Sequence, residues 1–311
     1  MADRILEDTT NFFLINSGDH IRVGERVFKV IGHAHESQFG IDDPKLWVLR
    51  VIDLQSNERK ILKLAFFETF FTTLGGVKIR CFRSPEKEAS ILKITRNNPH
   101  FMKGKDFKDV KGNNIRLLDV VRGKTYLSYI DSFKMTYDRY FNTVLPGILL
   151  KLVDVFKAIN FLHINGYRHG DIRNDHLYVE SETGNWVWID FDYDFETTEN
   201  PFSLDIFGLG TILSYTVGKG FHTAYMIAND PNRYGNLIDK VSEDDFSLLD
   251  QSMFLNLKKF YPIIPRPLND ILMHFSKSTD VYYEFVDEIL EDLNYFMKSW
   301  LIDEKGVLTD R

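Results

Sequence analysis

The chain has little of several features that define common protein classes. It contains one cysteine, Cys81, in 311 residues, which excludes an internal disulfide framework and favours a free structural thiol in a reducing compartment. No apolar run approaches the roughly 20 residues that a membrane-spanning helix needs. The start, "MADRILEDTTNFF", lacks the basic and apolar regions of a secretory signal. These absences predict a soluble, cytoplasmic protein without a membrane span.

The chain also has no excess of positive charge. Its 38 lysine and arginine residues are outnumbered by 45 aspartate and glutamate residues, giving a net charge of -7. Nucleic-acid-binding proteins usually carry a basic surface, so we expect no nucleic-acid partner. The length is sufficient for two modest domains or one bilobal unit with substantial cores.

The first third of the chain has the pattern of strands. The segments "ERVFKVIG", "KLWVLRVIDL" and "KILKLAF" are rich in β-branched and aromatic residues, and "QSNER" supplies a turn between the last two. The segment "SPEKEASILKIT" predicts a helix with Ser84 as its cap and Pro85 at its first position. "IRLLDVV" and "KTYLSYI" predict two more strands. We therefore expect a five-stranded antiparallel sheet and one helix within residues 1–129.

From about residue 140 the pattern becomes helical. An apolar stripe at three- and four-residue spacing runs from 145 to Gly166, which is a good helix stop. "LYVESETGNWVWIDF" predicts a hairpin, and the nearly all-apolar "SLDIFGLGTILSYTVGKG" predicts a buried helix. The fold class is therefore α+β: a β-rich lobe, residues 1–129, followed by a mostly helical lobe, residues 130–311.

A cluster of charge lies between the long helix and the hairpin, in "GYRHGDIRNDHLYV". Asp171 is on this loop, and the hairpin would bring Asp190 to the same edge. Two carboxylates there can divide the chemistry, since one can orient a hydroxyl and accept its proton while the other holds a divalent metal. Arg173 could neutralise a migrating phosphoryl group. The alternative is a surface turn with charge pairs and no chemistry.

The order of these pieces resembles the protein-kinase-like superfamily along most of the chain. A strand lysine (Lys63), a helix glutamate (Glu88), "HGD" and "DFD" follow one another as in that fold. The resemblance implies a bilobal protein-kinase-like fold that binds ATP and Mg, with Mn as an alternative. It makes Lys63 a phosphate-binding residue, Glu88 its ion-pair partner, and Asp190 a metal ligand.

The same resemblance assigns further roles. It implies that "KTYLSYIDSF" is the strand and hinge beside adenine, with Leu127 near the gatekeeper position and backbone groups offered from Ser128 to Ile130. Asp171 and Arg173 become the catalytic residues. Asp205 becomes a brace for the catalytic loop, and His169 a buried structural ring.

The sequence departs from the family's pattern at four places. The phosphate-covering loop "IGHAHESQFG" keeps Gly32 but has Ala34 and His35 where further glycines are usual, which predicts weak nucleotide affinity. His176 replaces a metal-binding Asn; it is either a ligand that favours Mn or Zn over Mg, or a bystander. Gly170 replaces an Arg that normally reads a phosphate, so we expect no such gating. Asp190 and Asp205 are only 15 positions apart, without an Ala-Pro-Glu motif, so a conventional peptide platform is doubtful.

These features favour an atypical kinase, an ATP-dependent phosphotransferase that transfers the γ-phosphoryl group to a hydroxyl acceptor. A protein Ser/Thr is the preferred acceptor, and a small molecule, as in sugar and aminoglycoside kinases, is an alternative. A second alternative is a pseudokinase, a scaffold or nucleotide-binding module without turnover. Transfer of AMP is a third. For the phenylalanine-rich "AFFETFFTT" we favour core packing over a partner site.

Overall fold

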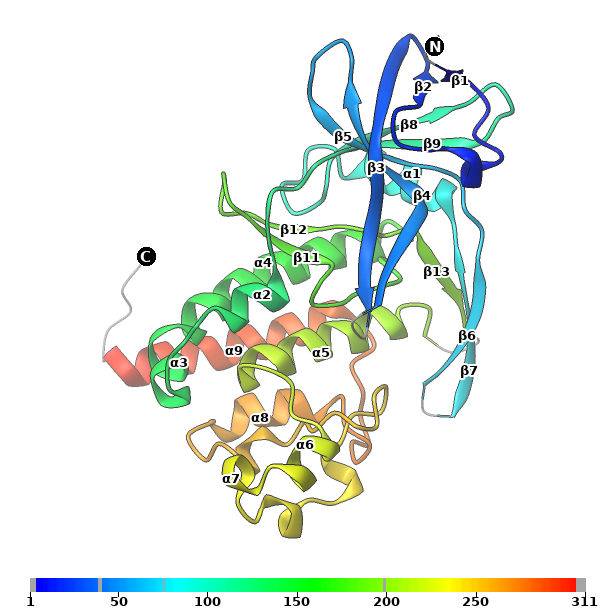
Figure 1. Ribbon diagram of the computed structural model, residues 1–311. Coiled ribbons are helices and arrows are strands. Elements are labelled where there is room, and N and C mark those ends of the chain that lie inside the picture. Colours follow the sequence, from blue (N-terminus) through cyan, green and yellow to red (C-terminus); the bar gives the residue numbers. More distant parts are fainter. Residues whose placement is uncertain (1–3, 39–40, 75, 198–199, 306–311) are drawn as a thin grey trace.

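The computed structural model describes residues 4–38, 41–74, 76–197 and 200–305. The N-terminal half is rich in strands and the C-terminal half is mainly helical, as Figure 1 shows. The predicted α+β class is therefore confirmed. Within the described ranges, no helix combines the length and the apolar character required to cross a membrane.

The main sheet contains seven strands in the order β1-β2-β3-β4-β5-β9-β8, rather than the expected five. The expected strand at "KTYLSYI" is not part of this sheet, and three strands are additional: β1, which has two residues and pairs in parallel with β2, β2, which reads HIRV, and β8, which reads GKDFK. They are too short or too charged to show the sustained apolar alternation by which a strand is recognised in a sequence. The strands are β1 (Ile5–Leu6), β2 (His20–Val23), β3 (Arg26–Gln38), β4 (Ile41–Asp53), β5 (Arg59–Lys63), β8 (Gly104–Lys108) and β9 (Asn114–Asp119).

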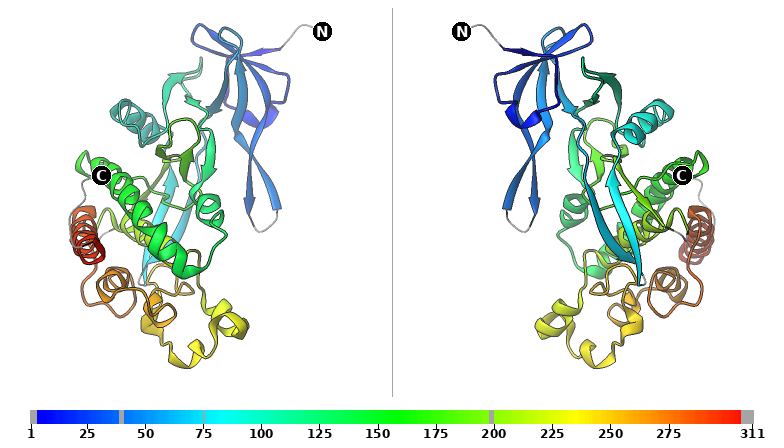
Figure 2. Two further views of the ribbon diagram at one scale, coloured as in Figure 1. Left: turned by 90° about the vertical axis from the view of Figure 1, so that its left-hand side faces the viewer. Right: turned by 90° about the vertical axis from the view of Figure 1, so that its right-hand side faces the viewer.

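The predicted hairpin between the second and third strand segments is confirmed as β4 and β5, which pair antiparallel from Val48↔Lys63 to Ile52↔Arg59. Strand β5 also pairs with β9, so Lys63, its last residue, is fixed between Val48 of β4 and Arg116 of β9. The hairpin of β3 and β4 is much longer than the turn expected there, and Figure 2 shows it projecting from the sheet on the side away from the C-terminal helix α9 (Val286–Lys305).

Helix α1 (Pro85–Ile94) begins where the sequence predicts. The Ser84 side chain accepts a hydrogen bond from the Lys87 amide at 3.2 Å, and Pro85 occupies the first position. Ile91 and Leu92 are buried on its inner side. This start fixes the orientation of Glu88, one turn into the helix.

Two three-stranded sheets complete the strand-forming part. One has the order β10-β11-β12, and its β11–β12 pair is the predicted hairpin; the other has the order β13-β7-β6. The strands are β10 (Gly123–Thr125), β11 (Leu177–Glu180), β12 (Trp186–Trp188), β6 (Thr69–Leu74), β7 (Val77–Arg83) and β13 (Tyr193–Glu196).

The segment "KTYLSYI" is a strand only up to Thr125, and the rest of this expectation is wrong. The Thr125 side chain accepts a hydrogen bond from the Ser128 amide and caps helix α2 (Tyr126–Asp131). Tyr126 and Ile130 are both fully buried, one helical repeat apart. Their aromatic and β-branched character suggested a strand, and tertiary burial decided for a helix. The boundary between residues 129 and 130 falls inside this helix, and the division into two lobes at that point stays an interpretation.

The phenylalanine-rich segment packs in the core only in part: Phe66 stacks on Trp47, with ring centroids 4.1 Å apart, against the buried residues of the main sheet. It forms β6 and the residues before it, and Phe67, Phe70 and Phe71 are exposed. Strand β7 of this hairpin pairs on its other side with β13, in the register Tyr193↔Arg83 to Glu196↔Arg80. The hairpin therefore places the segment before α1 beside the segment after Asp190. Cys81 of β7 is buried there, and burial raises its pKa to about 11, as befits a structural thiol.

The helical part is built around two predicted helices. Helix α4 ends at Ile164, next to Gly166 at φ 76°, and α5 is buried along almost its whole length, both as expected. The bounds of the helices not given above are α3 (Tyr137–Thr143), α4 (Leu145–Ile164), α5 (Ser203–Gly218), α6 (Ala224–Asn229), α7 (Pro231–Tyr234) and α8 (Arg266–Met273). The short 3-10 helices are η1 (Phe12–Leu14), η2 (Leu237–Lys240), η3 (Glu243–Asp245) and η4 (Leu257–Lys259).

Two hydrophobic cores support these parts. The smaller core lies within the main sheet, around Phe28, Val51 and Leu62. The larger one joins α1, the β11–β12 hairpin and the helices, with Trp188 fully buried and its indole N–H donating to the Val155 carbonyl at 3.0 Å. The charged loop at 167–176 lies against this larger core.

Candidate active site

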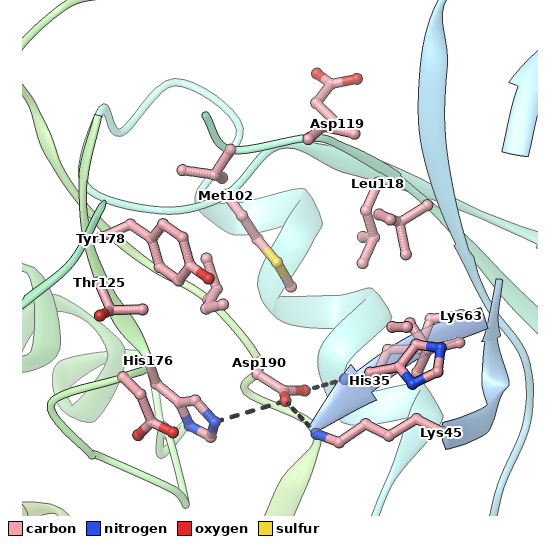
Figure 3. A pocket seen from close by; sticks show the side chains of 17 residues that line it. His35, Lys45, Lys63, Met102, Leu118, Asp119, Thr125, His176, Tyr178 and Asp190 are labelled. Carbon is pink, nitrogen blue, oxygen red and sulfur yellow. Dashed lines mark hydrogen bonds and ion pairs between the residues drawn. The ribbon is translucent and has the colours of Figure 1, made fainter. Parts of the chain in front are cut away.

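A cleft of about 420 Å³ lies between the main sheet and the segments around β11 and β12. Figure 3 shows Lys45, Lys63 and Asp190 together at one end, with Met102 and Leu118 at a distance from them. About half of the remaining lining residues are apolar, so the cleft offers an apolar slot next to a charged end. This combination suits a flat, apolar ring that carries an anionic group. Further apolar lining comes from Val48, Ile61, Val120, Val121 and Ile189.

Lys63 is the centre of the charged end. Its ammonium is buried and lies 3.1 Å from Glu88 Oε1 and 3.0 Å from Asp192 Oδ2, and it also donates to Asp190 Oδ1. Burial by itself would lower the pKa of Lys63, but the surrounding carboxylates outweigh it and raise the pKa above its ordinary value. Lys63 is therefore a firmly charged cation held at the charged end of the cleft.

Glu88 is the partner that the sequence predicts for Lys63. Its side chain is fully buried, and its second oxygen accepts a hydrogen bond from Arg116 Nε at 3.0 Å. Arg116 is also fully buried and donates to the Leu64 carbonyl at 3.1 Å. Sequence reasoning missed Arg116 because one arginine in the apolar strand "IRLLDVV" gives no sign of its partner. Arg116 and Lys63 each bind one oxygen of Glu88, and together they fix the position of its carboxylate.

Asp190 follows β12 and adopts a positive φ of 61°. A non-glycine residue in this region stores strain, which is typical of functional sites. Its second oxygen lies 3.6 Å from Lys45 Nζ and 3.7 Å from His176 Nε2. Burial would raise the pKa of Asp190, but Lys63, His176 and Lys45 reverse this and hold the pKa well below its usual range. Asp190 is thus a permanent carboxylate.

His176 connects the two predicted carboxylates. Its Nδ1 lies 2.8 Å from the Asp171 carbonyl oxygen and 3.4 Å from Asp171 Oδ2, while Nε2 faces Asp190. A carbonyl oxygen can only accept, so Nδ1 carries a proton, and in the neutral form of the ring Nε2 presents a lone pair. That lone pair and the Asp190 carboxylate point at one another across 3.7 Å. An imidazole nitrogen and a carboxylate are both metal ligands, so this pair can supply two ligands to a divalent metal. Among the described residues, no group of three or more His, Cys, Asp or Glu side chains completes such a site.

Asp171 lies on the loop where the sequence predicts it, partly exposed. Burial of the carboxyl, which exceeds the opposing effect of His176 and Arg173, raises the pKa of Asp171 above its ordinary value. A raised pKa favours acceptance of a proton from a hydroxyl. The structure therefore brings Lys63, Glu88, Asp171, His176 and Asp190 into one neighbourhood.

Arg173 is engaged with a neighbour on its own loop. Its Nε and Nη2 donate to the two Asp175 oxygens at 3.0 and 2.6 Å. Asp175 itself lines the cleft, so the guanidinium is held near its rim. A role for Arg173 toward phosphate stays a prediction.

The predicted phosphate-covering loop is part of the long β3–β4 hairpin, and its residues 39–40 lie outside the described residues. Gly32 has φ 147° at a register shift opposite Arg50, and a side chain there would meet the Arg50 guanidinium at 2.8 Å. Ala34 and His35 line the cleft. Ala34 lies in strand β3, where successive glycines would form a flexible turn. Its side chain therefore lines the cleft.

Ser128 and Ile130 do not lie where the predicted hinge would be. Both belong to α2: the Ser128 amide donates to Thr125 Oγ1, and the Ile130 carbonyl accepts from the Phe133 amide at 3.2 Å. Leu127, expected near the gatekeeper position, belongs to α2 as well. The cleft is lined at this end by Val120 and Val121, which follow β9, so the strand beside the cleft is one segment earlier than expected.

The bracing role of Asp205 is confirmed. Its carboxylate is fully buried and accepts hydrogen bonds from the amides of His169 and Gly170 at 2.7 and 2.8 Å, and from His163 Nε2 at 3.0 Å. These donors outweigh burial and lower the pKa of Asp205 to about 2. His169 is fully buried, as predicted, and burial lowers its pKa to about 3. The loop that carries Asp171 is therefore held by α5.

Two charged residues of the site have no counterpart in the sequence predictions for it. Lys45 reaches Asp190 from β4, where an isolated lysine gives no signal of a distant partner. Asp192, two positions after Asp190, is buried and binds Arg83 Nη1 through both oxygens at 2.9 and 3.0 Å. It serves an internal ion pair.

No protein-family model matches the chain, and no curated protein matches its sequence. Among solved structures, the PknI kinase domain of Mycobacterium tuberculosis matches with a TM-score of 0.50 and 14% identity, over 90% of this chain and 99% of that one. A mutant of that domain matches with a TM-score of 0.51 and 13% identity, over 90% and 98%. At this identity the likeness concerns the fold. Together with the order and geometry of the site, it shows that the chain has a bilobal protein-kinase-like fold.

Proposed function

We propose that the protein is an ATP-dependent phosphotransferase, an atypical kinase that transfers the γ-phosphoryl group to a hydroxyl acceptor. The observation that carries the proposal is the constellation of Lys63, Glu88, Asp171 and Asp190 around one cleft. The likeness to a kinase domain supports the fold on which this constellation depends.

In this function the apolar slot binds the adenine ring, and the Lys63 ammonium binds the α- and β-phosphates. Glu88, fixed by Arg116, keeps Lys63 at that point. Asp190 and His176 would hold a divalent metal, which when bound neutralises phosphate charge. The pairing of Lys63 and Lys45 with Asp190 is then exchanged for contacts with phosphate.

Asp171 orients the acceptor hydroxyl and accepts its proton, for which its raised pKa is favourable. Arg173 supports the γ-phosphate from the rim of the cleft. The preferred acceptor remains a protein Ser/Thr, with a small-molecule hydroxyl as the alternative; both require the same roles of Asp171 and Lys63.

The test is a set of thermal melts with ATP alone, with ATP and Mg²⁺, and with ATP and Mn²⁺. A ligand at ~100 times its dissociation constant adds about 2.7 kcal/mol to the folded state, which such a melt detects. We expect a shift that requires the metal and disappears in Asp190→Asn. Asp171→Ala is expected to keep the shift and to lose transfer from radiolabelled ATP.

Two results would contradict the proposal. No shift at millimolar ATP under any condition would favour the pseudokinase alternative, a scaffold that keeps the fold without nucleotide turnover. Transfer that persists in Asp171→Ala would show that another group accepts the proton. Asp154→Asn, on the exposed face of α4, is the matched control and is expected to behave as the wild type in both measurements.

A further inference from the structure

Lys87 is a buried cation that the proposed chemistry does not use. It lies in the first turn of α1, directly before Glu88, and only 8% of its surface is exposed. Its Nζ donates to the His169 carbonyl oxygen at 2.8 Å and also to the Tyr193 carbonyl oxygen. One ammonium therefore joins three segments: helix α1, the loop that carries Asp171, and strand β13 after Asp190.

Burying the Lys87 ammonium carries a desolvation cost. Removing the ammonium from water lowers its pKa to about 8. An apolar side chain of similar length would avoid this cost. Its two direct partners are backbone carbonyls, which fix where the segments lie relative to the ammonium. The geometry is that of a positioning contact.

Gly170 shows why this contact replaces the usual arrangement. At φ 87°, a Cβ on Gly170 would lie 1.8 Å from the Tyr193 carbonyl oxygen and 3.1 Å from Lys87 Nζ. An arginine at position 170 is therefore incompatible with β13 in this place. Position 170 therefore carries glycine in place of arginine, and the cation beside the Tyr193 carbonyl oxygen is supplied by Lys87 of α1.

Strand β13 is also held by other contacts within the chain, none of which involves a phosphate group. It pairs with β7 over four residues, Arg83 binds Asp192 through both oxygens, and Arg168 pairs with Asp194 at 2.8 Å. Since β7 leads directly into α1, the same segment that holds Asp192 also supplies Lys87.

We propose that Lys87 is a positioning residue that fixes the catalytic loop and strand β13 against α1, so that the site is set without phosphorylation of the segment after Asp190. The inference rests on the proposed phosphotransferase function as far as its effect on turnover is concerned. Its structural part, the hold on β13 and the loop, is independent of turnover.

The test compares Lys87→Met, which keeps the stem and removes the ammonium, with the control Lys93→Met on the exposed face of the same helix. Amide hydrogen exchange is measured by mass spectrometry. We expect Lys87→Met to accelerate exchange in residues 193–196 and 167–172 by about tenfold or more, and to leave α9 unchanged. Should Lys87→Met fail to fold, Lys87→Gln, with its shorter amide, is measured in the same way.

Steady-state kinetics provide a measurement that distinguishes a positioning role of Lys87 from a purely structural one. We expect kcat of Lys87→Met to fall about tenfold with KM for ATP unchanged, because Lys63 and Glu88 retain their contacts. Phosphatase-treated wild type is expected to keep full kcat. Unchanged exchange in 193–196, or loss of wild-type kcat after phosphatase treatment, would overturn the inference. A wild type without any transfer would refute the proposed function, and the exchange measurement would then decide the role of Lys87 alone.

Discussion

The substitution Asp205→Asn tests the brace that holds the loop carrying Asp171. The wild-type carboxylate accepts three hydrogen bonds, from His163, His169 and Gly170, while fully buried. An asparagine at 205 has one oxygen and an NH₂ group, so at least one of these donors would face another donor. A buried donor without an acceptor costs about 1–3 kcal/mol, and hydrogen bonds to a charged group contribute about 1.5–3 kcal/mol each.

The shifted pKa gives a second route to the same magnitude. The pKa of Asp205 is lowered to about 2 from 3.8, and nearly two pKa units correspond to about 2–3 kcal/mol in favour of the ionised form. We therefore expect Asp205→Asn to lower the free energy of unfolding at pH 7 by about 3 kcal/mol. Because the folded pKa is depressed, this stabilisation is present above pH 3.8 and is lost as pH falls toward 2.

The assay is urea unfolding of the wild type and Asp205→Asn at pH 7, 4 and 3. The difference between the two proteins is expected to be largest at pH 7 and to narrow at pH 3. Asp154→Asn is expected to stay within about 0.5 kcal/mol of the wild type, as is usual for an exposed site. The assignment of Asp205 as an ionised brace would be refuted if Asp205→Asn lowered the free energy of unfolding at pH 7 by less than about 1 kcal/mol. It would also be refuted if the difference in this free energy between the two proteins did not change with pH.

The remaining predictions concern the metal, the ion-pair network and acid stability. His176→Asn is expected to improve turnover with Mg²⁺ relative to Mn²⁺, because an amide oxygen is a harder ligand than an imidazole nitrogen; an unchanged ratio of kcat values would make His176 a bystander. Glu88→Gln is expected to lower the free energy of unfolding by about 3–5 kcal/mol and to raise KM for ATP, since Lys63 and Arg116 would share a neutral partner; a melt and a KM titration check both, and an effect under about 1 kcal/mol would contradict the bridge. His169 has its pKa lowered to about 3 from 6.5, so the unfolded chain takes up a proton first and the free energy of unfolding should fall by up to about 5 kcal/mol between pH 6.5 and 3; a wild-type curve that His169→Phe reproduces would exclude this group as the cause.

Several parts of the site could be predicted from the chain because their signals are local. Ser84 and Pro85 mark the start of α1, and Gly166 ends α4, because capping and left-handed backbone depend on a few adjacent residues. The order of Lys63, Glu88, Asp171 and Asp190 indicated a fold into which they could be placed. The buried environment of Asp205 followed from one carboxylate in an apolar helix, which requires donors.

Other parts could not be predicted, for reasons that are equally physical. "KTYLSYI" has residue types suited to strands, and its helical form depends on the burial of Tyr126 and Ile130 against distant helices. The exposed phenylalanines of β6 have the composition of a core segment, and only the pairing of β7 with β13 explains why the hairpin is where it is. Composition does not encode which surface a segment meets.

The sequence by itself determined the element types with strong periodicity or capping and the identity of the chemical groups, because these depend on neighbours within about one helical turn. The tertiary structure decided which groups meet. Lys63 and Asp190 are 127 positions apart, and Lys87 and Tyr193 are 106 apart, yet each pair is in direct contact. Contacts over such separations are set by the packing of α1, β13 and the loop that carries Asp171, and no local pattern records them.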